Sequence, residues 1–392
     1  MKHILAALTI LLAVSAAADD AHNALSKNKT EADAAIAALR AQGQASVDAL
    51  AAAGAELTDP LDVRRYRLAL DRVCRQRDCY TSRLFWYTDL QQAKGAARKS
   101  GKPILYLRLL GNLDDEVSCA NSRFFRTTLY SNPDIAHFMR EHFVLYWESE
   151  RPVPKVTIDF GDGRTIRETL TGNSIHYLLD AEGKPLDALP GLYSPAAFLA
   201  QLDQLQKLAH EYAIAQSPEN YLQQYHAEQI RNLTAAREAG LHSLTDPEPR
   251  PMFTAAQASI RARSKAAVES RFLSDFKPGL RDQALAQLRE IAAKHTAEVV
   301  FHPDSLTLME KKNGPLTDVM LANLRQTVAE DTLLNEYDLH LRIHQMLIGP
   351  RPTAAKLNED VYSGIFLTPA SDPWLGLKAV DTYTALQSPG SL

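Results

Sequence analysis

The middle of the chain alternates between amphipathic segments and short apolar runs, a pattern that predicts a mixed sheet flanked by helices. Thr88-Asp-Leu-Gln91 is a capping box, so we expect a helix to begin at Thr88 and to end at Gly101. Apolar runs of strand length follow, and a turn at Glu182-Gly183 predicts that the last two strands pair antiparallel. The predicted core strands are residues 103–110, 143–147, 175–179 and 186–189.

Helices and one hairpin are expected between and after these strands. Proline in a first turn and Ser or Asn at the N-cap mark the helix starts, and a Gly-Asp-Gly turn marks the hairpin. These elements are helices beginning near Cys119, Asn132 and Ser194, and a hairpin of residues 156–160 and 164–169.

The two flanks of this unit are helical in propensity. Residues 19–86 are Ala-rich at first and then rich in arginine, and they predict a helical N-terminal arm on the surface. Residues 211–392 predict a mainly α-helical C-terminal domain, with helices over 218–239, 253–273, 279–295 and 316–348. The apolar residues 366–376 near the end are expected to dock on the rest of the protein. The predicted fold class is therefore an α/β domain over residues 87–210 plus a helical domain.

The first residues have the three parts of a secretory signal. Lys2 and His3 precede an apolar run over residues 4–14, and small residues at 15–18 resemble a cleavage site. The run is too short to span a bilayer, which needs about 20 apolar residues. We therefore predict a signal peptide over residues 1–18, a periplasmic or secreted mature protein, and no transmembrane segment.

Composition narrows the expected ligands. The chain is 45% apolar and 23% charged, with a formal net charge of −4, so it lacks the basic balance expected of a nucleic-acid partner. The sequence has no Gly-rich phosphate loop, zinc-ligand spacing or serine nucleophile elbow. We therefore expect no cofactor and no metal.

Three cysteines in an exported chain leave one outside any intramolecular disulfide. Cys74 and Cys79 lie close together, and Cys119 stands apart. A local disulfide between Cys74 and Cys79 is the simplest pairing in an oxidising compartment, and the other two pairings stay open.

The order helix, strand, helix, strand, strand, strand, helix between Thr88 and about Leu208 resembles the thioredoxin-like superfamily. Four phrases carry the resemblance. The Ala-Lys-Gly to Gly-Lys-Pro-Ile-Leu phrase is similar to the opening of exported members, and the Asn-Pro-Asp-Ile-Ala-His-Phe phrase is similar to their second half-unit. The other two resemble the terminal hairpin and helix. The phrases cover residues 93–105, 132–138, 179–184 and 190–199, in a region that is under a third of the chain.

The resemblance implies a redox motif in which Cys119 matches the first cysteine and Ser122 replaces the second, giving Cys-Ala-Asn-Ser. A helix N-terminus at that position would stabilise a thiolate, and a single thiol could still form a mixed disulfide with a client. The family's cis-proline is replaced by Ser174, in the opposing loop that leads to His176. Asp114-Asp-Glu116 places negative charge near Cys119, which opposes thiolate formation.

Two functions follow from different classes. One is a monothiol thiol–disulfide protein of the cell envelope that traps or isomerises client disulfides, and whose partners are client protein thiols. The other is a non-catalytic binding or scaffolding protein that partners another envelope protein. An exposed Cys119 would favour the first, and a buried Cys119 the second.

Three other clusters have a chemical and a structural interpretation. Cys119, His176 and Asp180 could form a Cys-His-Asp hydrolase set, although a histidine inside a strand is usually a core residue. Asp159 and Asp162 could be calcium ligands, although a hairpin turn explains them and the remaining ligands are missing. A group of arginines around Cys74 could bind anions, although a solvated helical face is the default for exposed charge. This group contains Arg72, Arg75 and Arg77.

Overall fold

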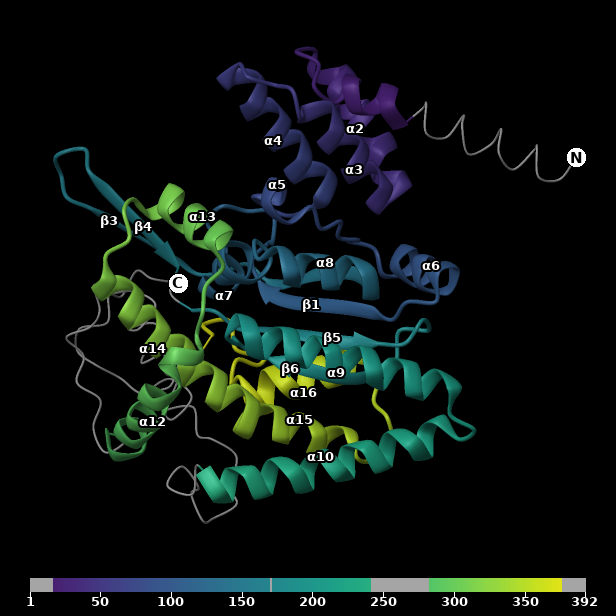
Figure 1. Cartoon of the computed structure of the whole chain (residues 1–392), viewed down its shortest axis with the longest axis vertical. Helices are drawn as coiled ribbons and strands as arrows, with labels where there is room; N and C mark the ends of the chain where they lie inside the picture. Colours follow the sequence, from purple (N-terminus) through teal and green to yellow (C-terminus); the bar gives the residue numbers. More distant parts are fainter. Residues whose placement is uncertain (1–16, 170, 241–281, 376–392) are drawn as a thin grey trace, which may run out of the picture.

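A four-stranded mixed sheet forms the centre of the molecule, with helices on both sides (Figure 1). The computed structural model describes residues 17–169, 171–240 and 282–375. The strand order is β2-β1-β5-β6, in which β1 pairs parallel with β2 and the other pairs are antiparallel. The strands are β1 (Ile104–Leu110), β2 (Val144–Arg151), β5 (Ser174–Leu179) and β6 (Pro185–Pro190).

The four predicted core strands are confirmed, including the antiparallel pair formed by β5 and β6. β2 continues past the apolar run to Arg151, because its polar end still pairs with β1. The first helix of this unit, α6 (Leu90–Ser100), is capped by Asp89 rather than by Thr88. The Asp89 carboxylate accepts a hydrogen bond from the Gln92 amide at 2.8 Å, which replaces the predicted capping box.

One face of the sheet packs against helices of the middle segment. Alternate residues of β1, Leu105, Leu107 and Leu109, lie in the same buried cluster as side chains of the helices on that face. These helices are α7 (Ala120–Phe124), the π-helical turn η1 (Phe125–Leu129), α8 (Pro133–His142) and α9 (Pro195–Ile214).

The other face packs against α6 and against the C-terminal part of the chain. Ile104, Tyr106 and Leu110 of β1 share a second buried cluster with residues 339–375. The sequence predicts these C-terminal helices in a domain of their own, whereas in the structure they form a layer on the sheet. They are η5 (Asn335–Leu339), α15 (His340–Leu347), α16 (Ala354–Asp360) and η6 (Val361–Ile365).

The N-terminal helices form a small bundle with a core of its own, at one end of the sheet (Figure 1). The sequence predicts a surface arm here, but Leu39, Val47 and Leu50 are fully buried against Leu70 and Val73. The many alanines let the helices approach closely, so few large apolar residues suffice for a core. The bundle contains α2 (Lys29–Gln42), α3 (Gln44–Gly54), α4 (Pro60–Cys74) and α5 (Cys79–Ser82).

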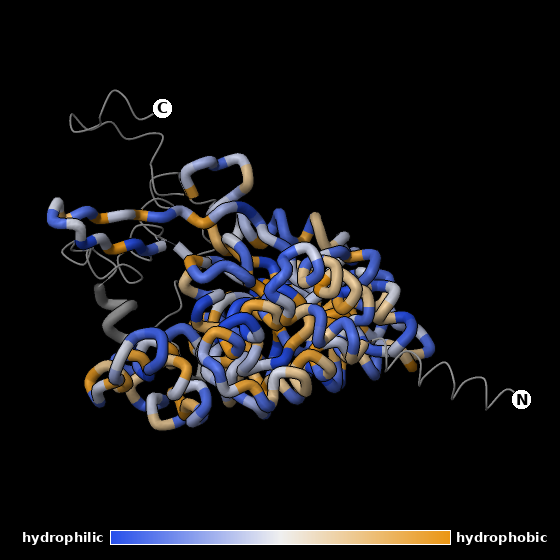
Figure 2. The backbone as a smooth tube through the Cα atoms, turned by 90° about the horizontal axis from the view of Figure 1, so that it is seen from above, coloured by the Kyte–Doolittle hydropathy of each residue, from blue (hydrophilic) through white to orange (hydrophobic). Residues whose placement is uncertain are grey.

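The predicted hairpin forms, and it projects from the body of the protein (Figures 1 and 2). Its strands are β3 (Lys155–Asp159) and β4 (Thr165–Thr169), and hydrophilic and hydrophobic positions alternate along it in Figure 2. The rest of the C-terminal region is mostly helical. Its elements are α10 (Pro218–Gly240), α12 (Asp282–His295), η4 (Thr296–Glu298), α13 (Pro303–Asn313) and α14 (Asp318–Leu334).

Some of the predictions concern residues that the structure does not describe. Residues 1–16 of the predicted signal peptide, the predicted helix over 253–273 and residues 279–281 of the next lie outside the described residues. Of the apolar tail, Phe366, Leu367 and Leu375 are buried, whereas Trp374 is partly exposed. Within the described ranges, no helix combines the length and apolar character needed to cross a bilayer.

Candidate functional site

Cys119 lies at the point where the chain enters α7 and is the N-cap residue of that helix. The Ser122 amide donates a hydrogen bond to its Sγ at 3.4 Å, so a backbone N–H points at the sulfur. Both residues are 0% exposed. The local geometry therefore suits a thiolate, but no solvent reaches the sulfur.

The C-terminal segment covers this position. Cys119 belongs to the same buried cluster as Tyr362, Ile365 and Phe366. The Tyr362 hydroxyl donates to the carbonyl of Asn173 at 3.4 Å, and the Asn173 side-chain amide donates to Thr368 Oγ1 at 3.0 Å. The loop before β5 and the C-terminal segment are thus joined over the thiol.

The Ser122 hydroxyl is hydrogen-bonded to Ser118 and not to the sulfur. It accepts a hydrogen bond from the Ser118 hydroxyl at 2.9 Å, and Ser118 Oγ in turn accepts one from Arg126 Nη2 at 3.2 Å. Arg126 is buried and lies 3.4 Å from a carboxylate oxygen of Asp78. This chain of contacts anchors the helix start and gives Ser122 a structural role.

Ser174 and His176, the two residues predicted to oppose the motif, have different neighbours. Ser174 Oγ accepts a hydrogen bond from the Asn121 side chain at 2.8 Å, so it does face the Cys-Ala-Asn-Ser segment. His176, two residues further along β5, packs against Phe125 and Phe198, and its Nε2 lies 2.7 Å from the Tyr130 hydroxyl. Burial lowers the pKa of His176 to about 3, so the ring is neutral at physiological pH.

The hydrolase set considered from the sequence is not assembled. Cys119 belongs to the buried cluster on one face of the sheet. His176 packs against Phe125 and Phe198, which belong to the cluster on the other face. Asp180 follows the far end of β5, where its carboxylate accepts from the amides of Glu182 and Lys184 in the β5–β6 turn. Asp159 and Asp162 likewise accept backbone hydrogen bonds within their own hairpin turn.

The acidic residues that precede Cys119 are paired with cations. Burial would raise the pKa of Glu116, but hydrogen bonds from Lys312 and Arg77 outweigh it and lower this pKa to about 2. The neighbouring aspartates have partners as well, so the negative charge near the sulfur is largely offset. These pairs are Arg75–Asp114 at 3.2 Å and Lys155–Asp115 at 3.3 Å.

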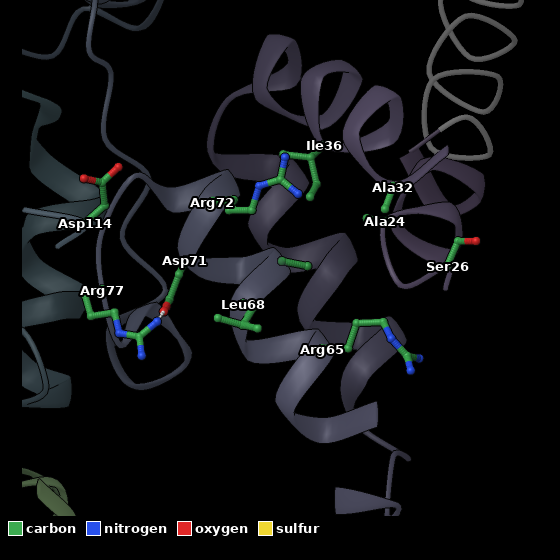
Figure 3. Close-up of a pocket in the computed structure, with 11 residues that line it drawn as sticks. Ala24, Ser26, Ala32, Ile36, Arg65, Leu68, Asp71, Arg72, Arg77 and Asp114 are labelled. Atoms are coloured by element: carbon green, nitrogen blue, oxygen red, sulfur yellow. Dashed lines mark hydrogen bonds and ion pairs between the residues drawn. The ribbon is translucent and has the colours of Figure 1, made fainter. Parts of the chain in front are cut away.

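The three arginines proposed as an anion site are already bound to carboxylates. Arg72 lies 2.6 Å from Asp33, and Arg77 lies 3.0 Å from Asp71. A cavity of about 370 Å³ lies beside them among the N-terminal helices, with Asp114 from the segment after β1 at its wall, and charges of both signs line it (Figure 3). The paired guanidiniums explain these residues as part of the packing between helices rather than as an anion patch.

A disulfide joins Cys74 to Cys79 and closes the loop after α4. Arg75 and Asp78 within the loop adopt left-handed conformations, with φ of 55° and 61°. The indole N–H of Trp147 in β2 donates to the Arg75 carbonyl at 2.7 Å. The closed loop therefore connects the N-terminal bundle to the sheet.

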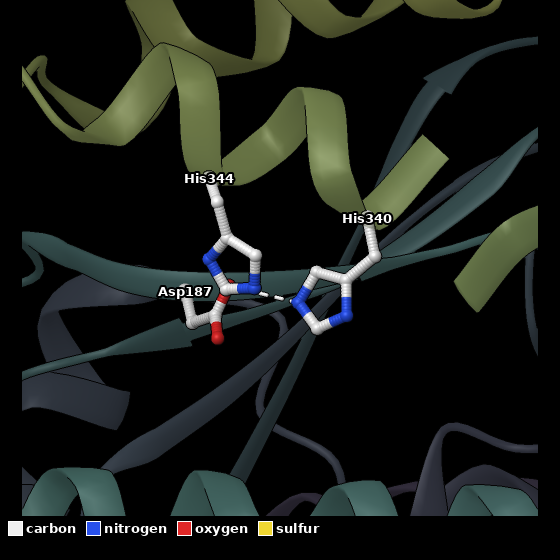
Figure 4. A group of neighbouring side chains, drawn as sticks. All are labelled: Asp187, His340 and His344. Atoms are coloured by element: carbon white, nitrogen blue, oxygen red, sulfur yellow. Dashed lines mark hydrogen bonds and ion pairs between the residues drawn. The ribbon is translucent and has the colours of Figure 1, made fainter. Parts of the chain in front are cut away.

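A second cluster was missed from the sequence. His340 and His344, one helical turn apart on α15, project toward Asp187 on β6 (Figure 4). Among the described residues these are the side chains whose arrangement could hold a metal ion, with ligand atoms within 4.8 Å of one another. The His-x-x-x-His spacing is a signal that would have identified the helix face, but not the aspartate.

Three histidines surround the buried carboxylate of Asp187, namely His226, His340 and His344. Burial would raise its pKa, but the neighbouring His344 and His340 outweigh this and hold the pKa well below its usual range. Burial lowers the pKa of His344 to about 3, so that its ring is neutral at pH 7. The pKa of His226, on α10, is also lowered, again chiefly by burial.

No protein-family model, curated protein or solved structure matches this chain. The functional argument therefore rests on the geometry of the two clusters.

Proposed function

We propose that this chain is an exported binding or scaffolding protein built on a thioredoxin-like domain that has lost dithiol chemistry. The burial of Cys119 carries the proposal, because a thiol must reach its target to exchange disulfides. Of the two functions that the sequence leaves open, the buried position favours the non-catalytic one.

The thioredoxin-like assignment is supported by the order of elements and by the place of the cysteine. Helix, strand, helix, strand, strand, strand, helix occur in that order from α6 to α9, with the β3–β4 hairpin as an addition. Cys119 follows β1 at the start of a helix, where the resemblance places it. Export is supported by the apolar N-terminal run and by the Cys74–Cys79 disulfide, which persists in oxidising compartments.

Monothiol exchange has one observation in its favour, the Ser122 N–H that points at the sulfur. Such a donor stabilises a thiolate. However, attack on a client disulfide also needs the C-terminal segment to leave, which would break the Tyr362–Asn173 and Asn173–Thr368 contacts. A closed ground state therefore disfavours exchange as the main activity.

The β3–β4 hairpin is the surface that best suits a protein partner. It is two-stranded and projects from the body, and Phe160 at its turn is 50% exposed. Unpaired strand edges can accept a strand from another chain. An envelope protein is the partner class that fits an exported scaffold.

Alkylation of the native protein tests the proposal. Iodoacetamide is added to the folded chain and to the chain in urea, and peptide mapping identifies the modified cysteine. We expect Cys119 to react only in urea. Rapid native reaction, or mixed-disulfide adducts that disappear in Cys119→Ser, would establish the monothiol function instead.

A further inference from the structure

A cluster of polar side chains from three elements lies in the interior of the protein, away from Cys119. Asp187 comes from β6, His340 and His344 from α15, and Tyr225 and His226 from α10. Asp187 is 0% exposed and His344 is 1% exposed. Burying so many polar groups in one place is costly unless each finds a partner.

The hydrogen bonds within the cluster leave two buried imidazole nitrogens without a partner in the described chain, Nε2 of His344 and Nε2 of His226. Asp187 Oδ1 lies 3.1 Å from His340 Nε2, and Oδ2 accepts from the Tyr225 hydroxyl at 3.0 Å. His344 Nδ1 lies 2.9 Å from His226 Nδ1, whereas His344 Nε2 has no hydrogen-bond partner among the described residues. A buried polar atom without a partner is rare in proteins and points to a bound ion or water.

The charge balance points the same way. Ion pairs of Asp187 in the described chain are with histidines alone, at 3.1 Å to His340 and 3.7 Å to His344. A fully buried carboxylate needs a compensating positive charge. A divalent cation would supply it and would use imidazole nitrogens as further ligands.

We propose that Asp187, His340 and His344 form a buried site for a divalent transition metal, with Zn²⁺ as the ion that suits the donors best. Zn²⁺ binds imidazole nitrogen and carboxylate oxygen. An ion between three atoms that lie within 4.8 Å of one another is at most about 2.8 Å from each, so shifts below about 1 Å give Zn–N distances of about 2.1 Å. Figure 4 shows the rings of His340 and His344 next to each other, both beside the Asp187 carboxylate.

The remaining members of the cluster support the ligands. His226 binds Nδ1 of His344, which leaves Nε2 for the ion and fixes the orientation of the ring. Tyr225 binds the second oxygen of Asp187. Since Asp187, His340 and His344 are buried from any substrate, the site is structural, and the ion would join α15 to the edge strand β6. This inference does not depend on the proposed function of the thioredoxin-like domain.

Metal content and melting temperature of the untagged full chain test the site. The protein is stripped with a chelator, loaded with Zn²⁺ or with Mg²⁺, and desalted before metal analysis. We expect one equivalent of retained Zn²⁺, no retained Mg²⁺, and a melting temperature that rises with Zn²⁺ alone. Retention of less than about a tenth of an equivalent of Zn²⁺ by the wild-type chain would show a hydrogen-bonded polar cluster instead.

Variants then assign the ligands. His340→Gln and His344→Gln should each weaken Zn²⁺ binding at least tenfold, whereas His210→Gln, on the exposed side of α9, should not change it. Equal Zn²⁺ binding in wild type and in the double variant would overturn the assignment. If the variants fail to fold, the wild-type stoichiometry and the Zn²⁺-specific rise in melting temperature decide the question without them.

Discussion

Asp71 is a buried carboxylate whose ionisation should weaken the folded state. It lies in α4 beside the disulfide loop and is 7% exposed. Its carboxylate accepts hydrogen bonds from the Cys79 amide at 2.9 Å and from Arg77 Nη1 at 3.0 Å. Burial nevertheless raises the pKa of Asp71 to about 6, because Arg77 is shared with Glu116 and compensates only in part.

The magnitude follows from this pKa. Raising it from 3.8 to about 6 makes the ionised form about 3 kcal/mol less favourable in the folded state than in the unfolded state. A raised folded-state pKa contributes stability that is fully present below the unfolded pKa, near pH 4, and is lost as the pH rises to about 6. The free energy of unfolding should therefore fall by about 2.5 kcal/mol between pH 4 and pH 7 through Asp71 alone, because a small part of the change already occurs below pH 4.

Asp71→Asn removes this dependence and keeps an oxygen acceptor for the Cys79 amide. We expect the variant to gain about 2.5 kcal/mol relative to wild type between pH 4 and pH 7. Urea unfolding followed by tryptophan fluorescence measures it, because Trp86 and Trp147 both hydrogen-bond to the loop beside Asp71. Asp48→Asn, on the exposed side of α3, controls for loss of a charge. A stability difference that is the same at both pH values would refute the reasoning.

Three further predictions test the disulfide, a buried hydrogen bond and an ion-pair cluster. Replacing Cys74 and Cys79 by Ala should lower the free energy of unfolding by about 2 kcal/mol, the loop-closure value for so short a loop, as measured by urea unfolding. Tyr130→Phe leaves its buried histidine partner in β5 without a hydrogen bond and should cost about 1–3 kcal/mol in thermal unfolding. Tyr193→Phe is its control and should be nearly neutral, because that hydroxyl has no partner in the described chain. Glu116→Gln should remove the part of the stability loss that is due to Glu116 as the pH falls from about 4.5 to about 2. It should cost no more than about 1 kcal/mol at pH 7, since this half-exposed carboxylate is screened by solvent. An unchanged acid transition would count against the pairing of Glu116.

The sheet could be predicted because local sequence specifies it. Strands β1 and β5 are mostly apolar and β2 begins with an apolar run, as expected for strands buried on both faces, and turn residues separate β5 from β6. The N-terminal bundle could not be predicted in the same way. Its buried positions include Ala35 and Ala69, and a hydrophobic pattern built on alanine does not distinguish a core from a surface.

The environment of Cys119 depends on contacts that are remote in sequence. Its position at the start of a helix was predicted, since a strand followed by a helix start is a local pattern. Its burial was left open, because Tyr362 and Phe366 come from the far end of the chain. The same holds for the cluster around Asp187. The two histidines are a local pair, but the aspartate joins them only when α15 packs against β6.

The C-terminal helices are better understood as the second layer of the sheet than as an appended domain. Tyr106, Tyr146 and Tyr177 form a row of neighbouring rings on the face that these helices cover, with ring centroids 4.7 and 5.5 Å apart. The Tyr177 hydroxyl donates to Asn358 of α16 at 3.1 Å, so the row is bonded to that layer as well as packed on it. A sheet with strands this apolar on both faces cannot leave one face to solvent. The layer that closes the sheet also covers Cys119, so the burial of the thiol and the completeness of the core have the same cause.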